Sequence, residues 1–177
     1  MRAAVPTAFG AGELEALAQA TERAREMIGQ YFALPDRWFE WTSHEVCTLR
    51  DLRQAEILGE GRLAQIRRLH RVLEEGAGRI LRCEVVCPHY RICLQDHNIL
   101  GRLRCRADLS SVDLLTWVLS HEYVHLVRFQ RLDTPYHAAG EAAAVEEARV
   151  SDIVRGILSR LGPPSLRRAS GDAPVAC

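Results

Sequence analysis

Hydrophobic positions recur at helical spacing over three long stretches of the chain. The first begins at Glu13 and should end before Pro35, because the residue before a proline disfavours the helical conformation. The second covers residues 53–75, and the third covers residues 138–161, up to the glycine and the two prolines that follow. The pattern therefore predicts three amphipathic helices, each with one buried face.

Between the second and third of these helices, short apolar runs bounded by turn residues favour extended structure. The runs are residues 79–87, 90–95 and 99–106. Pro88 separates the first run from the second, and Asp96-His97-Asn98 is typical of a turn between the second and the third. Residues 46–52 mix strand and turn signals. The sequence thus predicts a small, mainly antiparallel sheet.

A further helix is predicted from Ser110 to about Arg131. Ser110 is a favourable N-cap residue, and Asp113 stands three residues later, in the position of a capping-box acid. The segment is apolar on nearly every side of a helix. We therefore expect it to be the central, buried helix of the protein.

Together these elements predict an α+β fold in one domain over residues 13–161. A chain of 177 residues with 47% hydrophobic residues is long enough to bury a core of this kind. The helical N-terminal part is expected over residues 13–78, and the sheet with the last two helices over residues 79–161. Residues 1–12 are expected to be flexible, and residues 162–177 to form a disordered tail.

The charge of the chain is balanced, with 23 basic and 23 acidic residues. It gives no electrostatic attraction to nucleic acid or to an anionic membrane, and neither is expected as a partner. The chain has no apolar run of the ~20 residues that span a membrane and no apolar core of a secretory signal. A cytoplasmic protein with reduced cysteines is therefore predicted. Cys83 and Cys87 are interpreted as small buried residues of a strand, and the pattern gives no oligomeric state.

The most specific chemical signal is the run His121-Glu122-Tyr123-Val124-His125. His121 and His125 are four residues apart, so they share one helix face and can direct ring nitrogens at one metal ion. Glu122 lies roughly 100° farther round the helix, beside the ion, where a general base takes a proton from a metal-activated water. A chain of this composition contains such a motif by chance only ~0.02 times, which favours a metal site over two core histidines.

This motif resembles the His-Glu-x-x-His signature of the zincin metallopeptidases, and the wider likeness covers residues 80–160. The resemblance implies a zincin-like fold, one zinc ion, a peptide or protein substrate, and hydrolysis of a peptide bond with Glu122 as the general base. It also implies an edge strand that binds the substrate above the zinc by strand addition. The strands within residues 90–106 are expected to do so. The first 75 residues resemble no known family.

Zincins differ in their third protein ligand. The metzincin type has a His six residues after the second His, and Arg131 at that position excludes it. In the gluzincin type the third ligand is a Glu on a following helix. Glu146 and Glu147 both lie at the edges of the apolar stripe predicted over residues 138–161. Glu147 is slightly favoured, Glu146 is nearly as good, and His137 is a rival from the preceding loop.

The resemblance also assigns residues that would support the metal ligands. Asp152 occupies the place of the gluzincin carboxylate that hydrogen-bonds the first His, here His121. However, Asp152 lies five residues after Glu147 instead of the usual four, so Ser151 is a weaker candidate for the same role.

Other polar residues are candidates for contact with substrate. His97 or Asp96, in the predicted turn, would face the cleft. Tyr136 would supply a hydrogen bond to the oxyanion that forms during hydrolysis. Tyr123 is a poorer candidate for that role, because its place on the motif helix favours core packing.

Two functions of other classes also fit the sequence. The zincin-like site can bind zinc without turnover, as part of a regulatory or protein-interaction module. Alternatively, the six cysteines form a metal or redox module and the His-Glu-x-x-His run is incidental.

Overall fold

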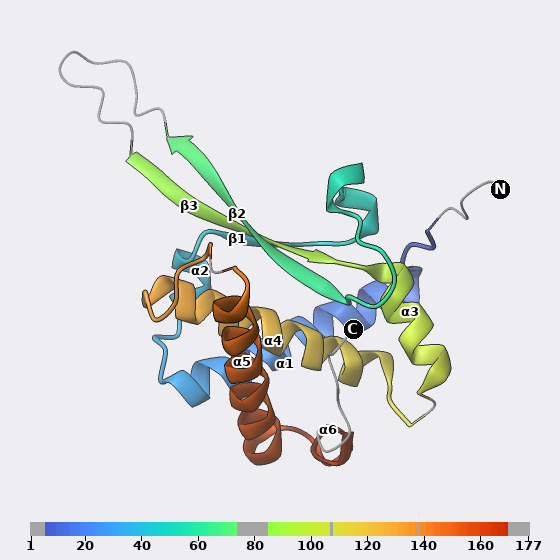
Figure 1. Ribbon diagram of the computed structural model, residues 1–177. Coiled ribbons are helices and arrows are strands. Elements are labelled where there is room, and N and C mark those ends of the chain that lie inside the picture. The colour runs from blue at the N-terminus through green and yellow to red at the C-terminus, as the bar shows by residue number, and fades with distance from the viewer. Residues whose placement is uncertain (1–5, 74–84, 107, 138, 170–177) are drawn as a thin grey trace.

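The computed structural model describes residues 6–73, 85–106, 108–137 and 139–169 (Figure 1). These residues form an α+β protein in which a three-stranded sheet lies over a group of helices. The helices are α1 (Ala11–Phe32), α2 (Trp38–Trp41), α3 (Asp96–Cys105), α4 (Ser111–Gln130), α5 (Glu141–Leu161) and α6 (Pro164–Ala169). The strands are β1 (His44–Cys47), β2 (Ala64–Leu73) and β3 (Val85–Leu94), and the 3₁₀ turns η1 (Leu49–Asp51) and η2 (Gln54–Glu56) lie between β1 and β2.

The sheet is mixed, which corrects the expectation of a mainly antiparallel sheet. Strand β3 is central; β2 pairs with it in antiparallel fashion and β1 pairs with it in parallel. Pro88 does not break the extended run as expected but lies within β3. The N–H of Tyr90 donates to Ser43 on the β1 side, and Pro88, two residues earlier, faces the same side beyond the end of β1. A proline is tolerated there because no N–H is needed.

The helix expected over residues 53–75 is wrong, because residues 64–73 form strand β2. Contacts from distant residues hold the preceding segment in a loop. The Gln95 side chain accepts the N–H of Leu58 and donates to the carbonyl of Glu56. The Asn98 side chain donates to two further carbonyls of the same loop. These bonds satisfy the loop backbone, so tertiary contacts override the helix-like spacing of its apolar residues.

The turn expected over residues 96–98 and the strand expected over residues 99–106 are also wrong, because both belong to helix α3. Asp96 is fully buried at the start of this helix. Its carboxylate accepts the N–H of Phe9 at 2.9 Å and the N–H of Leu49 at 3.0 Å. Burial raises the pKa of the Asp96 carboxyl, and these hydrogen bonds oppose that rise. Asp96 therefore ties three distant segments together.

Both ends of the described chain are more ordered than the sequence predicts. The flexible segment expected over residues 1–12 is wrong for its last part, since Phe9 is only 1% exposed and α1 begins at Ala11. Residues 1–5 lie outside the described residues. The disordered tail expected over residues 162–177 is wrong for its first part, since α6 packs Leu166 into the core. Residues 170–177 lie outside the described residues.

Replacement of Asp96 by alanine is expected to lower the free energy of unfolding by about 2–4 kcal/mol, because two backbone N–H groups lose their acceptor. Chemical denaturation measures this change. Asp108→Ala is the matched control, since Asp108 is exposed and its ion pair is with the neighbouring Arg106 on the surface; it should change stability by less than about 0.5 kcal/mol. Equal stability changes in the two variants would contradict the structural role of Asp96.

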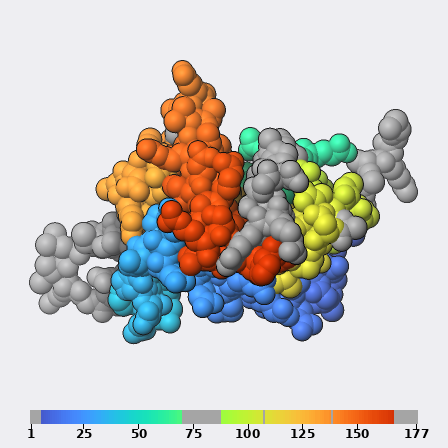
Figure 2. All heavy atoms as spheres, turned by 90° about the horizontal axis from the view of Figure 1, so that it is seen from below, coloured from blue at the N-terminus to red at the C-terminus, as the bar shows by residue number. Residues whose placement is uncertain are grey.

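Helix α4 is the central helix, as predicted. The Ser110 hydroxyl accepts the N–H of Asp113 at 3.1 Å, which confirms the N-cap. The helix packs against α1, α5 and β2, and it is buried along most of its length. On the face turned away from the sheet, α1 in blue and α5 in orange to red make up most of the surface (Figure 2). Neither α4 nor another described helix combines the length and apolar character needed to cross a membrane.

Helix α5 confirms the last predicted helix, although it begins at Glu141 rather than at residue 138. The apolar stripe faces the core as expected; its buried members are Val150, Val154, Ile157 and Leu158. This stripe sets the rotation of α5 against α4, and so decides which residues at its edges face the sheet.

The cysteines of the described residues are free thiols. Cys47 and Cys93 are buried opposite each other on β1 and β3, and Cys105 is exposed. Burial raises the pKa of Cys93 to about 12, which keeps its thiol protonated at neutral pH. Cys83 lies outside the described residues, as does the side chain of Cys87, so their expected burial stays a prediction.

Candidate metal centre

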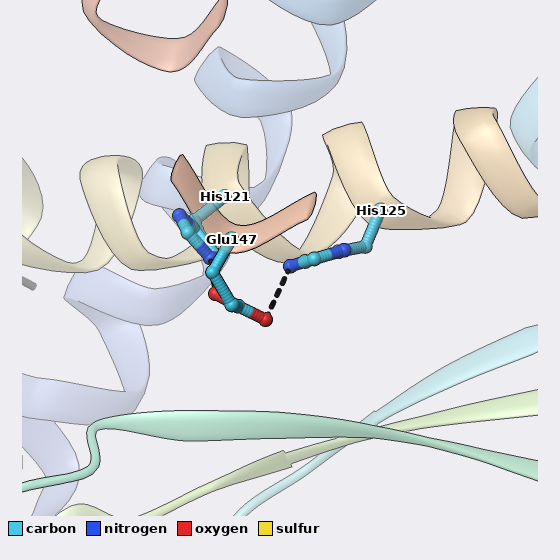
Figure 3. A group of neighbouring side chains, drawn as sticks. All are labelled: His121, His125 and Glu147. Carbon is cyan, nitrogen blue, oxygen red and sulfur yellow. Dashed lines mark hydrogen bonds and ion pairs between the residues drawn. The ribbon is translucent and has the colours of Figure 1, made fainter. Parts of the chain in front are cut away.

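Two histidines and one glutamate meet where α4 and α5 approach each other, on the side that faces the sheet (Figure 3). His121 and His125 lie one turn apart on α4, and each is 5% exposed. Nε2 of His121 lies 3.2 Å from Oε2 of Glu147, and Nε2 of His125 lies 3.2 Å from Oε1 of the same carboxylate. The three side chains thus point to one place from two helices.

The Glu147 carboxylate is strongly favoured in its charged form. Hydrogen bonds from His121 and then from His125 hold the pKa of Glu147 far below its usual value, against the opposing effect of burial. The neighbouring side chains of α5 that line the same cleft are small: Ala143, Ala144, Ala148 and Ser151. Because they are small, they leave the carboxylate open to the cleft, which has a volume of about 850 Å³.

The donor atoms of this group fit a metal ion. One atom from each of His121, His125 and Glu147 lies within 4.8 Å of the other two. Two imidazole nitrogens and one carboxylate oxygen are the ligand set of metal sites that keep a position open toward a cleft. In the part of the chain that the structure describes, no other group of His, Cys, Asp and Glu side chains has this geometry.

Glu122 lines the same cleft beside the three donors. Its side chain belongs to the buried part of α4, and burial raises its pKa to about 7. His121 and the more distant Arg62 oppose this rise, while the charge of Glu147 adds to it. A carboxyl group with such a pKa can accept and release a proton near neutral pH, as a general base must.

Glu146, one of the two glutamate candidates, does not belong to the donor group. Its carboxylate receives two hydrogen bonds from the guanidinium of Arg128, at 2.6 and 2.9 Å, and both residues are buried. Glu146 therefore faces α4 one turn beyond His125, whereas Glu147 faces the cleft. The sequence signal that identifies this pair is Arg128 itself, a basic residue on an otherwise apolar helix, which needs a partner when it is buried.

Asp152 does not make the hydrogen bond to His121 that the resemblance implies. Its side chain is 71% exposed and pairs with Arg155 at 2.8 Å, so it does not support His121. The extra residue between Glu147 and Asp152 turns the carboxylate to the outer face of α5. Ser151 does line the cleft. Within the described ranges, the buried Nδ1 atoms of His121 and His125 have no hydrogen-bond partner.

His97 and His137 lie outside the donor group. His97 is on α3, where its Nε2 lies 3.2 Å from the carbonyl of Leu58, and it does not line the cleft. Asp96 holds the fold together, as described above, and does not face the cleft either. His137 lies at the cleft, but it is exposed and its ring contacts Tyr136 instead of the donors.

The two tyrosines differ in position. Tyr123 is buried against Phe39 and His44 and does not line the cleft, so it cannot contact a substrate there. Tyr136 does line the cleft, but its hydroxyl is bound to strand β2. It accepts the N–H of Arg68 at 2.8 Å and donates to the carbonyl of Ile66 at 3.3 Å.

The strand beside the metal centre is β2, which corrects the expectation that strands within residues 90–106 lie there. Residues 62–66 line the cleft opposite α4 and α5. Strand β2 is an edge strand of the described sheet, because β3 is its only neighbour among the strands that the structure describes. Sequence patterns missed it because its residues were assigned to a helix.

Comparisons of this chain with protein-family models, with curated proteins and with solved structures find no match.

Proposed function

We propose that this protein is a zinc-dependent peptidase of the zincin type with a gluzincin-like ligand set. The observation that carries the proposal is the convergence of His121, His125 and Glu147, with Glu122 beside them in one cleft. The position of Glu147 on the helix after the motif helix supports the gluzincin-like assignment over a site completed by His137. The edge strand β2, opposite the donors, supports a peptide as the substrate.

The donor chemistry favours zinc among the common metals. Two neutral imidazoles and one carboxylate, with an open position, suit zinc, whereas magnesium and calcium prefer oxygen ligands alone. Zinc at such a site lowers the pKa of a bound water and polarises the carbonyl to be cleaved.

Each residue of the site then has its own role in hydrolysis. His121, His125 and Glu147 would hold the ion. Glu122 accepts the proton of the attacking water and delivers it to the nitrogen of the leaving amine. The N–H and C=O groups on the outer edge of β2 orient the peptide by strand addition.

One observation favours a second function, a zinc-binding interaction module without turnover. Metal-binding histidines commonly donate their second ring nitrogen to an acceptor that fixes the ring. Among the described residues, neither His121 nor His125 has such a partner. Cysteine-based metal binding has less support, since Cys47, Cys93 and Cys105 form no metal-binding group with other described residues.

Zinc content and peptide hydrolysis measured on the same purified protein test the proposal. We expect one zinc ion per chain, cleavage of a mixture of random 12-residue peptides, loss of cleavage with a chelator, and recovery when zinc is restored. Zinc binding without cleavage of the mixture would favour the interaction module. Cleavage that persists after the zinc has been removed would contradict a metal mechanism.

A further inference from the structure

The outer edge of β2 carries a row of backbone groups that face away from the sheet. The N–H of Tyr90 bonds to Ser43 on the β1 side, so Tyr90 and its partner Arg68 form a non-hydrogen-bonded pair. By the alternation of an antiparallel ladder, the N–H and C=O groups of Ala64, Ile66 and Arg68 then all point outward. These groups are the positions at which a peptide can add to the sheet.

Tyr136 occupies two of these positions. Its hydroxyl bonds to the N–H of Arg68 and to the carbonyl of Ile66. Toward the cleft, the N–H and C=O of Ala64 and the N–H of Ile66 remain, and the described residues provide no partner for them. The edge that is open to a peptide is therefore short, and it ends at a side chain that comes from the loop between α4 and α5.

An aromatic cluster holds Tyr136 in this place. The Tyr136 ring packs edge-on against Phe129, with the ring centroids 5.2 Å apart, and against Tyr90 at 6.4 Å. Phe129 in turn stacks on His125 at 5.7 Å. The blocked end of β2 is consequently the end beyond His125, whereas Arg62 and Glu122 lie toward the open end.

We propose that Tyr136 determines substrate length: it limits the peptide that the cleft accepts to a short arm on the side beyond His125. This inference rests on the proposed function. A peptide antiparallel to β2 has its N-terminal residues at the Arg68 end, so the short arm lies N-terminal to the scissile bond. The preferred substrates are then peptides cut close to their N-terminus, while the C-terminal arm is unrestricted by Tyr136.

Tyr136→Phe tests the inference because it removes only the hydroxyl. Random 12-residue peptides are digested with the zinc-loaded parent and variant, and mass spectrometry locates each cut. The parent should cut within the first few residues. The variant frees the Ile66 carbonyl and the Arg68 N–H and removes the hydrogen bonds that tie the ring to β2, so that an incoming peptide can push the ring aside. It should increase the share of internal cuts by about tenfold, as expected when two backbone hydrogen bonds become available to the substrate. Tyr123→Phe is the matched control, since this buried tyrosine is outside the cleft, and it should leave the cut positions unchanged.

Other results would overturn the inference. Equal loss of turnover at every cut position in Tyr136→Phe would assign the hydroxyl to the oxyanion. If the variant kept full activity and the same cut positions, Tyr136 would not limit the peptide on the N-terminal side of the scissile bond. Cuts restricted on the C-terminal side would exclude that role as well.

Binding provides a readout that does not depend on turnover. Zinc-loaded Glu122→Gln protein, with and without Tyr136→Phe, is titrated with random peptides of 4 and of 12 residues. The inference predicts about tenfold tighter binding of the longer peptides alone when the hydroxyl is removed. If the longer peptides bind more tightly as predicted but the parent protein hydrolyses no peptide, only the proposed function fails. Hydrolysis without the length effect would mean that only the inference fails.

Discussion

Glu147→Ala is expected to weaken zinc binding by more than about 100-fold. Mutation of a residue that only hydrogen-bonds to a metal ligand weakens metal binding by up to about 100-fold, and loss of a ligand itself should cost more. Glu147 supplies the single carboxylate of the donor group and lies 3.2 Å from both histidine nitrogens. Its removal leaves two imidazoles, which is one protein ligand fewer than a catalytic zinc site uses. Zinc titration in competition with a chromogenic chelator measures the change.

Glu146→Ala is the matched control from the preceding position. It is expected to keep zinc binding and to lower the stability of the fold. Zinc binding should persist, because Glu146 is bound to Arg128 and not to the histidines. Stability should fall by about 3–5 kcal/mol, because the guanidinium of Arg128 stays buried and loses both hydrogen bonds to Glu146, keeping only the half-exposed carboxylate of Asp133 at 3.7 Å. Thermal denaturation should show a midpoint lower by roughly 10 °C.

The comparison of the two glutamates can fail in two informative ways. If Glu146→Ala lost zinc in a folded protein and Glu147→Ala kept it, the assignment of the third ligand would be reversed. If both variants bound zinc like the parent, the carboxylate would not be a ligand at all. The double variant Glu146→Ala/Arg128→Met should regain much of the lost stability, since it removes both buried charges.

Glu122→Gln is expected to lower peptide hydrolysis by about 10²–10⁴-fold with zinc binding retained. Glutamine has nearly the shape of glutamate but cannot accept the proton of the attacking water. The measurements are kcat with a cleaved peptide and the zinc content of the same sample. Hydrolysis at the rate of the parent would assign the base to another residue, and loss of zinc would place Glu122 among the ligands.

The same substitution has an expected effect on the metal-free protein. Burial raises the pKa of Glu122 from 4.5 to about 7, so between these pH values the folded state keeps a proton that the unfolded state releases. The stability of the parent should therefore fall as pH rises through this window, by about 3 kcal/mol in all. Metal-free Glu122→Gln lacks this loss. It should melt above the metal-free parent at pH 8, and the difference should disappear near pH 4.

Local sequence patterns were sufficient for the helices that carry the donors. Ser110 and the apolar residues after it specify α4, and the spacing of His121 and His125 places both on one face whatever surrounds the helix. Helix α1 and helix α5 follow from apolar stripes in the same way. These predictions succeed because capping and 3.6-residue periodicity act within a few neighbouring residues.

Local patterns failed where distant residues supply the hydrogen bonds. The apolar residues within 53–75 are spaced like a helix, yet Gln95 and Asn98 hold the loop before β2. The residues of α3 resembled a strand, yet the buried Asp96 begins a helix. The edge strand beside the metal centre was consequently missed, and the strand role was assigned to residues 90–106.

The relative positions of the two histidines and Glu122 were thus determined by the sequence alone, because three positions within five residues of one helix have a fixed geometry. The third member of the donor group was decided only by the tertiary structure. Glu146 and Glu147 lie at opposite edges of one apolar stripe, and periodicity cannot rank them. When α5 packs against α4, Glu146 pairs with Arg128 and Glu147 faces His121 and His125. The reason is that a buried guanidinium requires a carboxylate partner, and only one of the two glutamates can reach it.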